Sequence, residues 1–499
     1  MPAPPPTSAA SWGWRLLGCG IALAAFANAA AYIAYASNPL VASDGWYFID
    51  AFLAKALESG VDLQDYFVKR DQFDHAQPVG KLLLLLNARW FGLDFVYESF
   101  VGLALAAAMF ACCILATRGM GATRQGNSLR MLGVGALAAS LVTLNCGMVF
   151  NWSLVTLTYL PYLMATLGAL AAWHAFHRDR RIGLVVMSLA IAFAIDDVGL
   201  IINAAVAATC LLAGIRLRRL RAGATLAALV IASELAYLAF NHAFLEQQQG
   251  QGGDGLATSL ASLWARVGEL PVLLRVVFGS MLAHINPLVH YFAGNAANVQ
   301  WVLALVMLAA HGWFWWRATR GEWNAMVFLA VTLMLVLYGF ICGIVYARVP
   351  EYGMNYLNEP RYMVFYLLGN VALVCMLLGQ PQPDRPGRVF AFAAKHVLLA
   401  ALILLQVPLS RHTWDEARYL GGYYHTMAWQ MLVLGKGRVP ETCVPLLVAC
   451  AMPASEREEA VEFLRKHQLN VYSPDFVRRY RLQALADAAR QMPDAAGGQ

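Results

Sequence analysis

Charged residues are scarce in this chain. Asp, Glu, Lys and Arg make up 13% of its 499 residues, about half the fraction expected of a soluble protein. The nine cysteines show neither CxxC spacing nor a Cys/His metal pattern. The sequence also lacks a repeat of fixed period, coiled-coil heptads and a basic surface interleaved with aromatic residues. These absences argue against a soluble enzyme, a repeat protein and a nucleic-acid-binding protein.

Long apolar blocks dominate what is present. Hydrophobic residues make up 60% of the chain, and they form blocks rather than stripes. A block of about 20 apolar residues crosses the bilayer as a helix, because every backbone amide in lipid needs an internal partner. We therefore predict an all-α polytopic membrane protein with about eleven transmembrane helices. The expected spans are 16–35, 97–117, 131–150, 152–176, 182–195, 198–215, 222–240, 298–316, 324–346, 362–379 and 389–408.

Basic residues gather in short loops between these blocks. By the positive-inside rule they place the N-terminus in the cytoplasm and the C-terminus in the periplasm of a bacterial inner membrane. The loops are those that contain Arg118, Arg124 and Arg130, then Arg178, Arg180 and Arg181, then Arg216 to Arg221, then Arg317 and Arg320, then Arg385 and Arg388.

The segment 270–297 is too polar for a confident span. We expect it to be broken or re-entrant at the outer face. Its two histidines, His284 and His290, are interpreted as packing residues rather than ligands.

Two regions are expected outside the membrane. The first outer loop, 37–96, contains two amphipathic pieces, 46–58 and 79–91, which should lie along the membrane surface. The chain then divides into a transmembrane bundle, 1–408, and a small periplasmic tail, 409–499.

The tail carries two further signals. Ser455 with Glu458 three residues later predicts the start of a helix with a capping box. Cys443 and Cys450 would lie in an oxidising compartment, where they could form a disulfide.

Ionisable groups beside the bilayer are costly and mark candidate sites. Asp44 follows the first span among aromatic residues, where it either caps the next helix or belongs to a site. The stretch 69–78 concentrates titratable groups directly before an apolar helix, either as a solvated capping loop or as a site. Its charged members are Lys69, Arg70, Asp71, Asp74 and His75.

Two more clusters follow. Asp196 and Asp197 lie at a hinge between two short spans, as N-caps, as cation ligands or as partners of basic residues from a neighbouring loop. In the stretch 351–362, Arg361 opens a span from the outside, against the positive-inside bias. With Arg348 nearby it suits a phosphate, which a guanidinium binds bidentately.

The layout of these motifs resembles a known superfamily. It comprises an outer Asp in Ser-Asp-Gly-Trp-Tyr-Phe at 43–48, the His75-x-x-Pro78 pattern, a polar hinge at 194–200, and an Arg-Tyr pair at 361–362. These features resemble the GT-C glycosyltransferases, integral-membrane enzymes that use polyprenyl-phosphate sugars. The tail stretch 460–472 looks like the end of uncharacterised bacterial members.

The resemblance implies transfer of a sugar from a polyprenyl-phosphate donor to a glycan or lipid acceptor of the cell envelope, with membrane lipid as the other partner. Such a transfer needs a base and a cation for the leaving phosphate. Asp44 would be the base, with Asp74 and His75 as further catalytic residues. The donor phosphate would be bound at Arg361, Tyr362, Lys69, Arg70, Arg348, Asp196 and Asp197. Some members of the superfamily need a divalent cation. Whether this chain needs one is left open, and Asp74 or Asp197 would be its ligand.

Two other functions compete with this one. A transporter or flippase of lipid-linked glycans usually has charges at the membrane midplane and two related halves, whereas the charges here gather at one face. A polymerase or ligase of such glycans typically has an arginine-rich late outer loop, but the loop 347–361 carries only Arg348 and Arg361.

Overall fold

The computed structural model describes residues 9–69, 76–117, 124–178, 180–244, 261–380 and 389–493, and all regular structure within these ranges is helical. In this part of the chain nine helices are long and apolar enough to cross a membrane. Two shorter apolar helices, Ser128–Leu141 and Arg181–Ile195, accompany them. The predicted all-α polytopic membrane protein is confirmed. The count of about eleven is not, because the two short helices fall below the usual length of a full span.

The long helices are α1 (Ala9–Ala36), α5 (Phe95–Ala116), α9 (Tyr159–Arg178), α11 (Asp197–Arg216), α12 (Leu220–Phe244), α16 (Ala296–Arg320), α17 (Ala325–Tyr352), α18 (Met363–Gly379) and α19 (Val389–Leu434). The two short apolar helices belong to α6 (Arg124–Leu141) and α10 (Arg181–Ile195). Two single turns, α7 (Met148–Asn151) and α8 (Ser153–Thr156), precede α9. Helix α18 lies at the centre, almost completely buried between α17, α6 and α14 (Leu270–Leu282).

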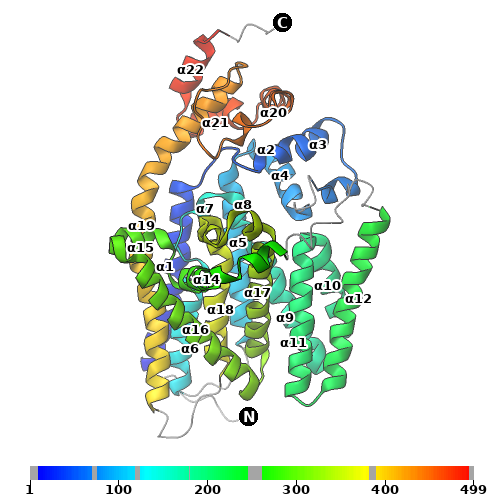
Figure 1. Ribbon diagram of the computed structural model, residues 1–499, viewed down its shortest axis with the longest axis vertical. Coiled ribbons are helices and arrows are strands. Elements are labelled where there is room, and N and C mark those ends of the chain that lie inside the picture. Colours follow the sequence, from blue (N-terminus) through cyan, green and yellow to red (C-terminus); the bar gives the residue numbers. More distant parts are fainter. Residues whose placement is uncertain are drawn as a thin grey trace.

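The bundle has two chemically different ends (Figure 1). At one end Arg216 donates to the carbonyl oxygens of Arg320 and Gly321, at 2.8 and 3.2 Å. We call this the basic end, because it gathers the arginine-rich connections. The opposite end, which we call the tail end, carries the surface helices and the C-terminal helices. Its members are α2 (Gly45–Phe48), η1 (Ile49–Ala54), α3 (Lys55–Glu58), η2 (Leu63–Phe67), α4 (Pro78–Phe91), η9 (Val448–Cys450), α20 (Ala454–Lys466), η10 (Asn470–Tyr472), α21 (Pro474–Arg479) and α22 (Gln483–Gln491).

The predicted span 131–150 is wrong in its second half. Helix α6 ends at Leu141, and residues 142–147 form a buried non-helical segment. Such backbone persists inside a membrane protein only where other groups satisfy it. Here Asn145 donates to the carbonyl of Ser280 at 3.1 Å and accepts from the amide of His284 at 2.7 Å. These partners are remote in sequence, so the local pattern gave no sign of them.

The break predicted within 270–297 is confirmed. Helix α14 ends at Leu282, and α15 (Ile285–Phe292) begins after His284. The His284 ring caps α15 by accepting a hydrogen bond from the backbone amide of Asn286. A 3₁₀ turn, η5 (Ala293–Asn295), then leads into α16. The buried His284 also hydrogen-bonds the carbonyl of Asn358 at 2.7 Å. Helix α12 ends at the tail end, and α16 ends at the basic end.

The expected domain boundary at 408 falls inside one helix. Helix α19 runs for 46 residues with Pro408 in its interior, and it reaches from the basic end into the tail (Figure 1). The predicted capping box is also wrong. Helix α20 has Pro453 at its N-cap and no side-chain cap hydrogen bond, because the extended backbone of Pro453 starts the helix before Ser455.

The tail and the first outer loop share one hydrophobic core. Trp46, Ile49 and Phe52 of the loop are fully buried against residues of α19, α20 and α21. The two predicted amphipathic pieces correspond to α2–α3 and to α4. Buried polar contacts reinforce the joint, since Asp94 accepts hydrogen bonds from Arg479 at 2.6 Å and from Tyr480 at 2.8 Å. The tail therefore folds onto the loop rather than around a core of its own.

An exposed ionic contact closes the same joint, and its pH dependence can be predicted. Hydrogen bonds from Lys466 and His467 lower the pKa of Glu58 below its ordinary value. A group with a lowered pKa contributes stability above its unfolded-state pKa and loses it as the pH falls through the lowered value. We expect the protection factors of amides in α3 and α20, corrected for the intrinsic pH dependence of exchange, to fall below about pH 4.5, and Glu58→Gln to remove that step. A step that persists in Glu58→Gln would contradict the assignment.

Candidate functional site

Asp44 is an exposed charge in an otherwise buried segment. Its neighbours Ala42, Gly45 and Trp46 are buried, whereas the Asp44 side chain reaches solvent at the tail end. Asp44 occupies the N-cap position of α2 but makes no capping hydrogen bond. The helix-cap interpretation therefore does not account for its carboxylate. A π-helical turn, η1, follows directly, and such turns are frequent at functional sites.

Arg361 lies in η7 (Pro360–Tyr362), at the start of α18, within a group of tyrosines. Its guanidinium donates to the hydroxyl of Tyr356 and lies over the rings of Tyr356 and Tyr362, at 5.6 and 5.5 Å from their centroids. Its Nε is buried and has no hydrogen-bond partner. Within the described residues no carboxylate forms a salt bridge with this arginine.

The tyrosine group extends outward and includes a second arginine. Tyr352 stacks on Tyr356 with ring centroids 4.4 Å apart and is 48% exposed, so the stack opens to solvent. Tyr356 belongs to η6 (Met354–Asn358), which connects α17 to Arg361. Arg348, one turn before Tyr352, acts electrostatically on Tyr352 and on Tyr362. In the described part of the chain Arg348 has no ion-pair partner either.

An electrostatic interaction links Asp44 to Arg361. The charge of Asp44 acts on the guanidinium of Arg361, although less strongly than Tyr362, Tyr356 and Glu359 do. The two residues come from opposite halves of the chain and do not form a salt bridge. An acid and a base held close without neutralising each other can act on a third molecule between them. We call Asp44, Arg348, Arg361 and Tyr362, with Tyr352 and Tyr356, the outer cluster.

Lys69, Asp196 and Asp197 form a separate, internally satisfied group. The Lys69 ammonium lies 3.0 Å from Asp196 and 2.6 Å from Asp197. Asp196 is buried and also accepts hydrogen bonds from the hydroxyl of Tyr237 and from the amide of Ala76. Of the interpretations left open for this acid pair, pairing with a basic residue of a neighbouring loop is therefore the one observed.

The charges in this group disfavour the phosphate considered for it. Burial by itself lowers the pKa of Lys69, but the hydrogen bond that Lys69 donates to Asp197 and the charge of Asp196 outweigh burial, so the pKa is raised. The lysine thus stays charged, and the two carboxylates more than balance its charge, which leaves little to attract a phosphate. The ammonium lies against one oxygen, Oδ2, of each carboxylate. Within the described residues no group of three or more His, Cys, Asp or Glu is arranged to hold a metal ion.

Backbone strain marks the same hinge. Asp196 has φ 48° and ψ −126°, a conformation that non-glycine residues adopt only when their surroundings enforce it. The enforcing contacts are those from Lys69, Tyr237 and Ala76. We interpret the group as a lock that fixes the first outer loop to the hinge between α10 and α11. Arg70, Asp74 and His75, which were predicted next to Lys69, lie outside the described residues.

The tyrosines at 352 and 356 were not predicted as site residues. Tyrosine is common at membrane interfaces, so neither position carries a signal in the sequence. Their role depends on the 3₁₀ turns η6 and η7, which bring Tyr356 and Tyr362 together against the guanidinium of Arg361.

Comparisons with models of protein families, with characterised proteins and with solved structures each returned no match. The function must therefore be argued from the chemistry of the outer cluster.

Proposed function

We propose that this chain is a membrane glycosyltransferase that moves a sugar from a polyprenyl-phosphate donor to a cell-envelope acceptor. One observation carries the proposal: the charge of Asp44 acts on Arg361, and within the described residues no salt bridge neutralises either side chain. The transfer needs this combination, since a carboxylate can remove the proton of the acceptor hydroxyl while a guanidinium stabilises the leaving phosphate.

The remaining members of the outer cluster suit a lipid-linked phosphate sugar. Arg348 and Arg361 supply two cations, and a guanidinium binds phosphate oxygens bidentately. Tyr356 and Tyr362 pack edge to face, with ring centroids 6.0 Å apart, and the guanidinium of Arg361 lies against both rings, which limits the directions its N–H groups can take. The two arginines of the cluster lie near the end of α17 and at the start of α18. In the orientation proposed here, this is the side on which the phosphate of a membrane-embedded prenyl chain would lie.

We place the tail end in the periplasm and the basic end in the cytoplasm of a bacterial inner membrane. The arginines of the connections at the basic end follow the positive-inside rule in this orientation. The disulfide between Cys443 and Cys450 lies at the tail end, and disulfides persist in oxidising compartments such as the periplasm.

A transfer assay in detergent tests the proposal and separates it from the transporter alternative. Detergent micelles have no second compartment, so a flippase forms no product there, whereas a transferase joins the sugar to an acceptor. The purified protein would be incubated with polyprenyl-phosphate sugars and envelope glycan acceptors, and the product mass measured. Growth of one acceptor by repeated units would favour the polymerase alternative. Absence of product with every donor, together with donor translocation in vesicles, would contradict the proposal.

Arg361→Gln is expected to lower the transfer rate about tenfold to a hundredfold, since a hydrogen bond to a charged group contributes roughly 1.5–3 kcal/mol. The matched control is Arg478→Gln, because Arg478 is 77% exposed at the tail end and pairs only with Asp475 beside it. Steady-state rates of the two purified variants would be compared with wild type. Equal rates for both variants would remove Arg361 from the site.

A further inference from the structure

The segment that presents Asp44 has no regular structure of its own. It runs from Ser37 to Asp44, between α1 and α2, and is held by hydrogen bonds and by the burial of Leu40, Val41 and Ala42. From α19 and the tail, two hydrogen bonds reach this segment and one reaches the last residue of α1. Tyr424 donates to the carbonyl of Ala36 at 3.1 Å, Asn470 donates to the carbonyl of Pro39 at 3.0 Å, and the amide of Ser43 donates to the carbonyl of Leu446 at 2.8 Å.

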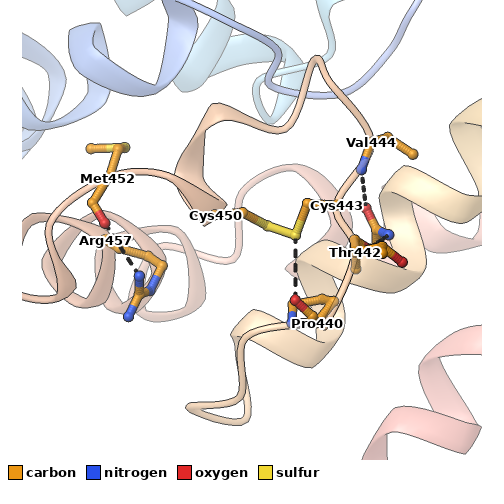
Figure 2. The surroundings of a disulfide bond; sticks show 8 residues. Pro440, Thr442, Cys443, Val444, Cys450, Met452 and Arg457 are labelled. Atoms are coloured by element: carbon orange, nitrogen blue, oxygen red, sulfur yellow. Dashed lines mark hydrogen bonds between the residues drawn. A yellow bond between two sulfur atoms is a disulfide. The ribbon is translucent and has the colours of Figure 1, made fainter.

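Leu446 lies in the loop that the disulfide closes. Cys443 and Cys450 are joined, and the residues between them arch toward the segments of the first outer loop (Figure 2). Side chains of α19 fix the base of the loop, since Gln430 donates to the carbonyl of Thr442 at 2.8 Å and accepts from the amide of Val444 at 2.9 Å. The amide of Leu446 donates to the hydroxyl of Tyr423 at 3.3 Å. Leu446 therefore bridges α19 and Ser43.

Ser43 itself is under backbone strain. Its φ is 49°, in the left-handed region that disfavours side chains larger than hydrogen. Such a residue keeps its conformation only while the surroundings enforce it. One contact acts directly on the strained backbone: the hydrogen bond that the Ser43 amide donates to the Leu446 carbonyl. When this bond is lost, Ser43 can relax and the direction of Asp44 changes with it.

We propose that the Cys443–Cys450 disulfide positions Asp44 through the Leu446 carbonyl and the Ser43 amide, so that reduction of the disulfide releases the segment 37–44. A cross-link across a short loop restricts the conformations available to Leu446. Because a reductant opens the bond reversibly, the positioning is redox-sensitive. The contact chain stands on geometry alone, while its effect on catalysis rests on the proposed function.

Amide hydrogen exchange tests the contact chain without any assay of activity. The full-length protein in nanodiscs would be compared in three forms: oxidised, reduced with a phosphine, and as the double variant Cys443→Ser/Cys450→Ser. We expect the Ser43 amide to exchange about tenfold faster in the last two, which corresponds to the net value of one hydrogen bond. Amides in the interior of α5, beyond the Phe95 amide that donates to Pro39, should be unchanged. Reoxidation of the reduced wild type should restore protection, which keeps the test valid if the double variant fails to fold.

Two controls make the result specific. Cys342→Ser removes an exposed free thiol of α17 and should leave exchange at Ser43 unchanged. Tyr423→Phe removes the hydroxyl that holds Leu446 and should raise exchange at Ser43 with the disulfide intact. Unchanged exchange at Ser43 in a protein whose mass shows an open disulfide would overturn the proposal.

Transfer activity separates this proposal from the proposed function. If the oxidised protein transfers sugar, reduction should lower the rate about tenfold at a temperature where the reduced protein is still folded, and reoxidation should restore it. An unchanged rate alongside faster exchange would overturn the positioning of a catalytic Asp44. If the oxidised protein is inactive with every donor, the proposed function fails, and the exchange result alone then decides the contact chain.

Discussion

Replacing Asp44 by asparagine is expected to lower the rate of sugar transfer by about 10²–10⁴-fold, the usual contribution of a general base. Asparagine has nearly the same shape, but its amide cannot accept the proton of the acceptor hydroxyl. The Asp44 carboxylate is exposed and makes no hydrogen bond within the described residues, so the variant should fold and express normally. The rate would be measured with purified protein in detergent.

The matched control is Asp475→Asn. Asp475 is also an acidic residue at the tail end, 78% exposed, and pairs only with Arg478 one turn away. Its variant should transfer sugar at the wild-type rate. In cells, mass analysis of envelope glycans from a deletion strain complemented with each variant would show the same difference. Normal glycans from the Asp44→Asn strain, at wild-type protein levels, would remove Asp44 from the mechanism.

Lys69→Met is expected to destabilise the protein by about 3–5 kcal/mol, because removing one partner of a buried ion pair leaves the other charge uncompensated. Asp196 is 1% exposed and would keep only the neutral donors Tyr237 and Ala76. Without Lys69, the backbone of Asp196 could also relax from its strained conformation, which would weaken the contact between the first outer loop and the hinge. Thermal unfolding in detergent, followed by loss of monodisperse protein, would measure the change.

Lys55→Met is the matched control for this effect. Lys55 also pairs with an aspartate, Asp65, at 2.6 Å, but its side chain is 52% exposed. An exposed pair contributes at most about 1 kcal/mol, so this variant should melt close to wild type. Equal losses of stability in the two variants would show that burial of Asp196 does not matter and that the lock is ordinary surface charge.

Features set by local pattern were predictable from the sequence. Apolar blocks bounded by charged residues predicted the long helices. The polar residues of 270–297 predicted the break before His284. The amphipathic pieces at 46–58 and 79–91 gave the surface helices. In each case the signal lies within the segment itself, since burial in lipid or along its surface acts on every residue of the helix.

Features that depend on distant partners were not predictable. The end of α6 at Leu141 is stabilised by Asn145 bonding to Ser280 and His284, far along the chain. The outer half of α19 stays helical because it packs against the first outer loop in a shared core. A single sequence does not show which residues meet in this way.

The candidate site shows the same division. The acidic and basic residues were found because charge beside a bilayer is rare, and Asp196 and Asp197 do meet a basic residue of a neighbouring loop. The sequence could not show that Lys69 is neutralised there while Arg361 is not. That difference arises from which side chains the fold places around each cation, including the two adjacent tyrosine rings against Arg361.

Because α19 is continuous, its length fixes how far its outer residues stand from the membrane. At 1.5 Å per residue its 46 residues extend about 69 Å, more than twice the ~30 Å thickness of the hydrocarbon layer. Tyr423, Tyr424 and Gln430 therefore stand at a height and angle fixed by a rigid rod anchored in lipid. Each added or deleted residue after Pro408 would turn these side chains by about 100° and move them by 1.5 Å. The number of residues in that stretch therefore sets the distance between the membrane and the loop that carries Asp44.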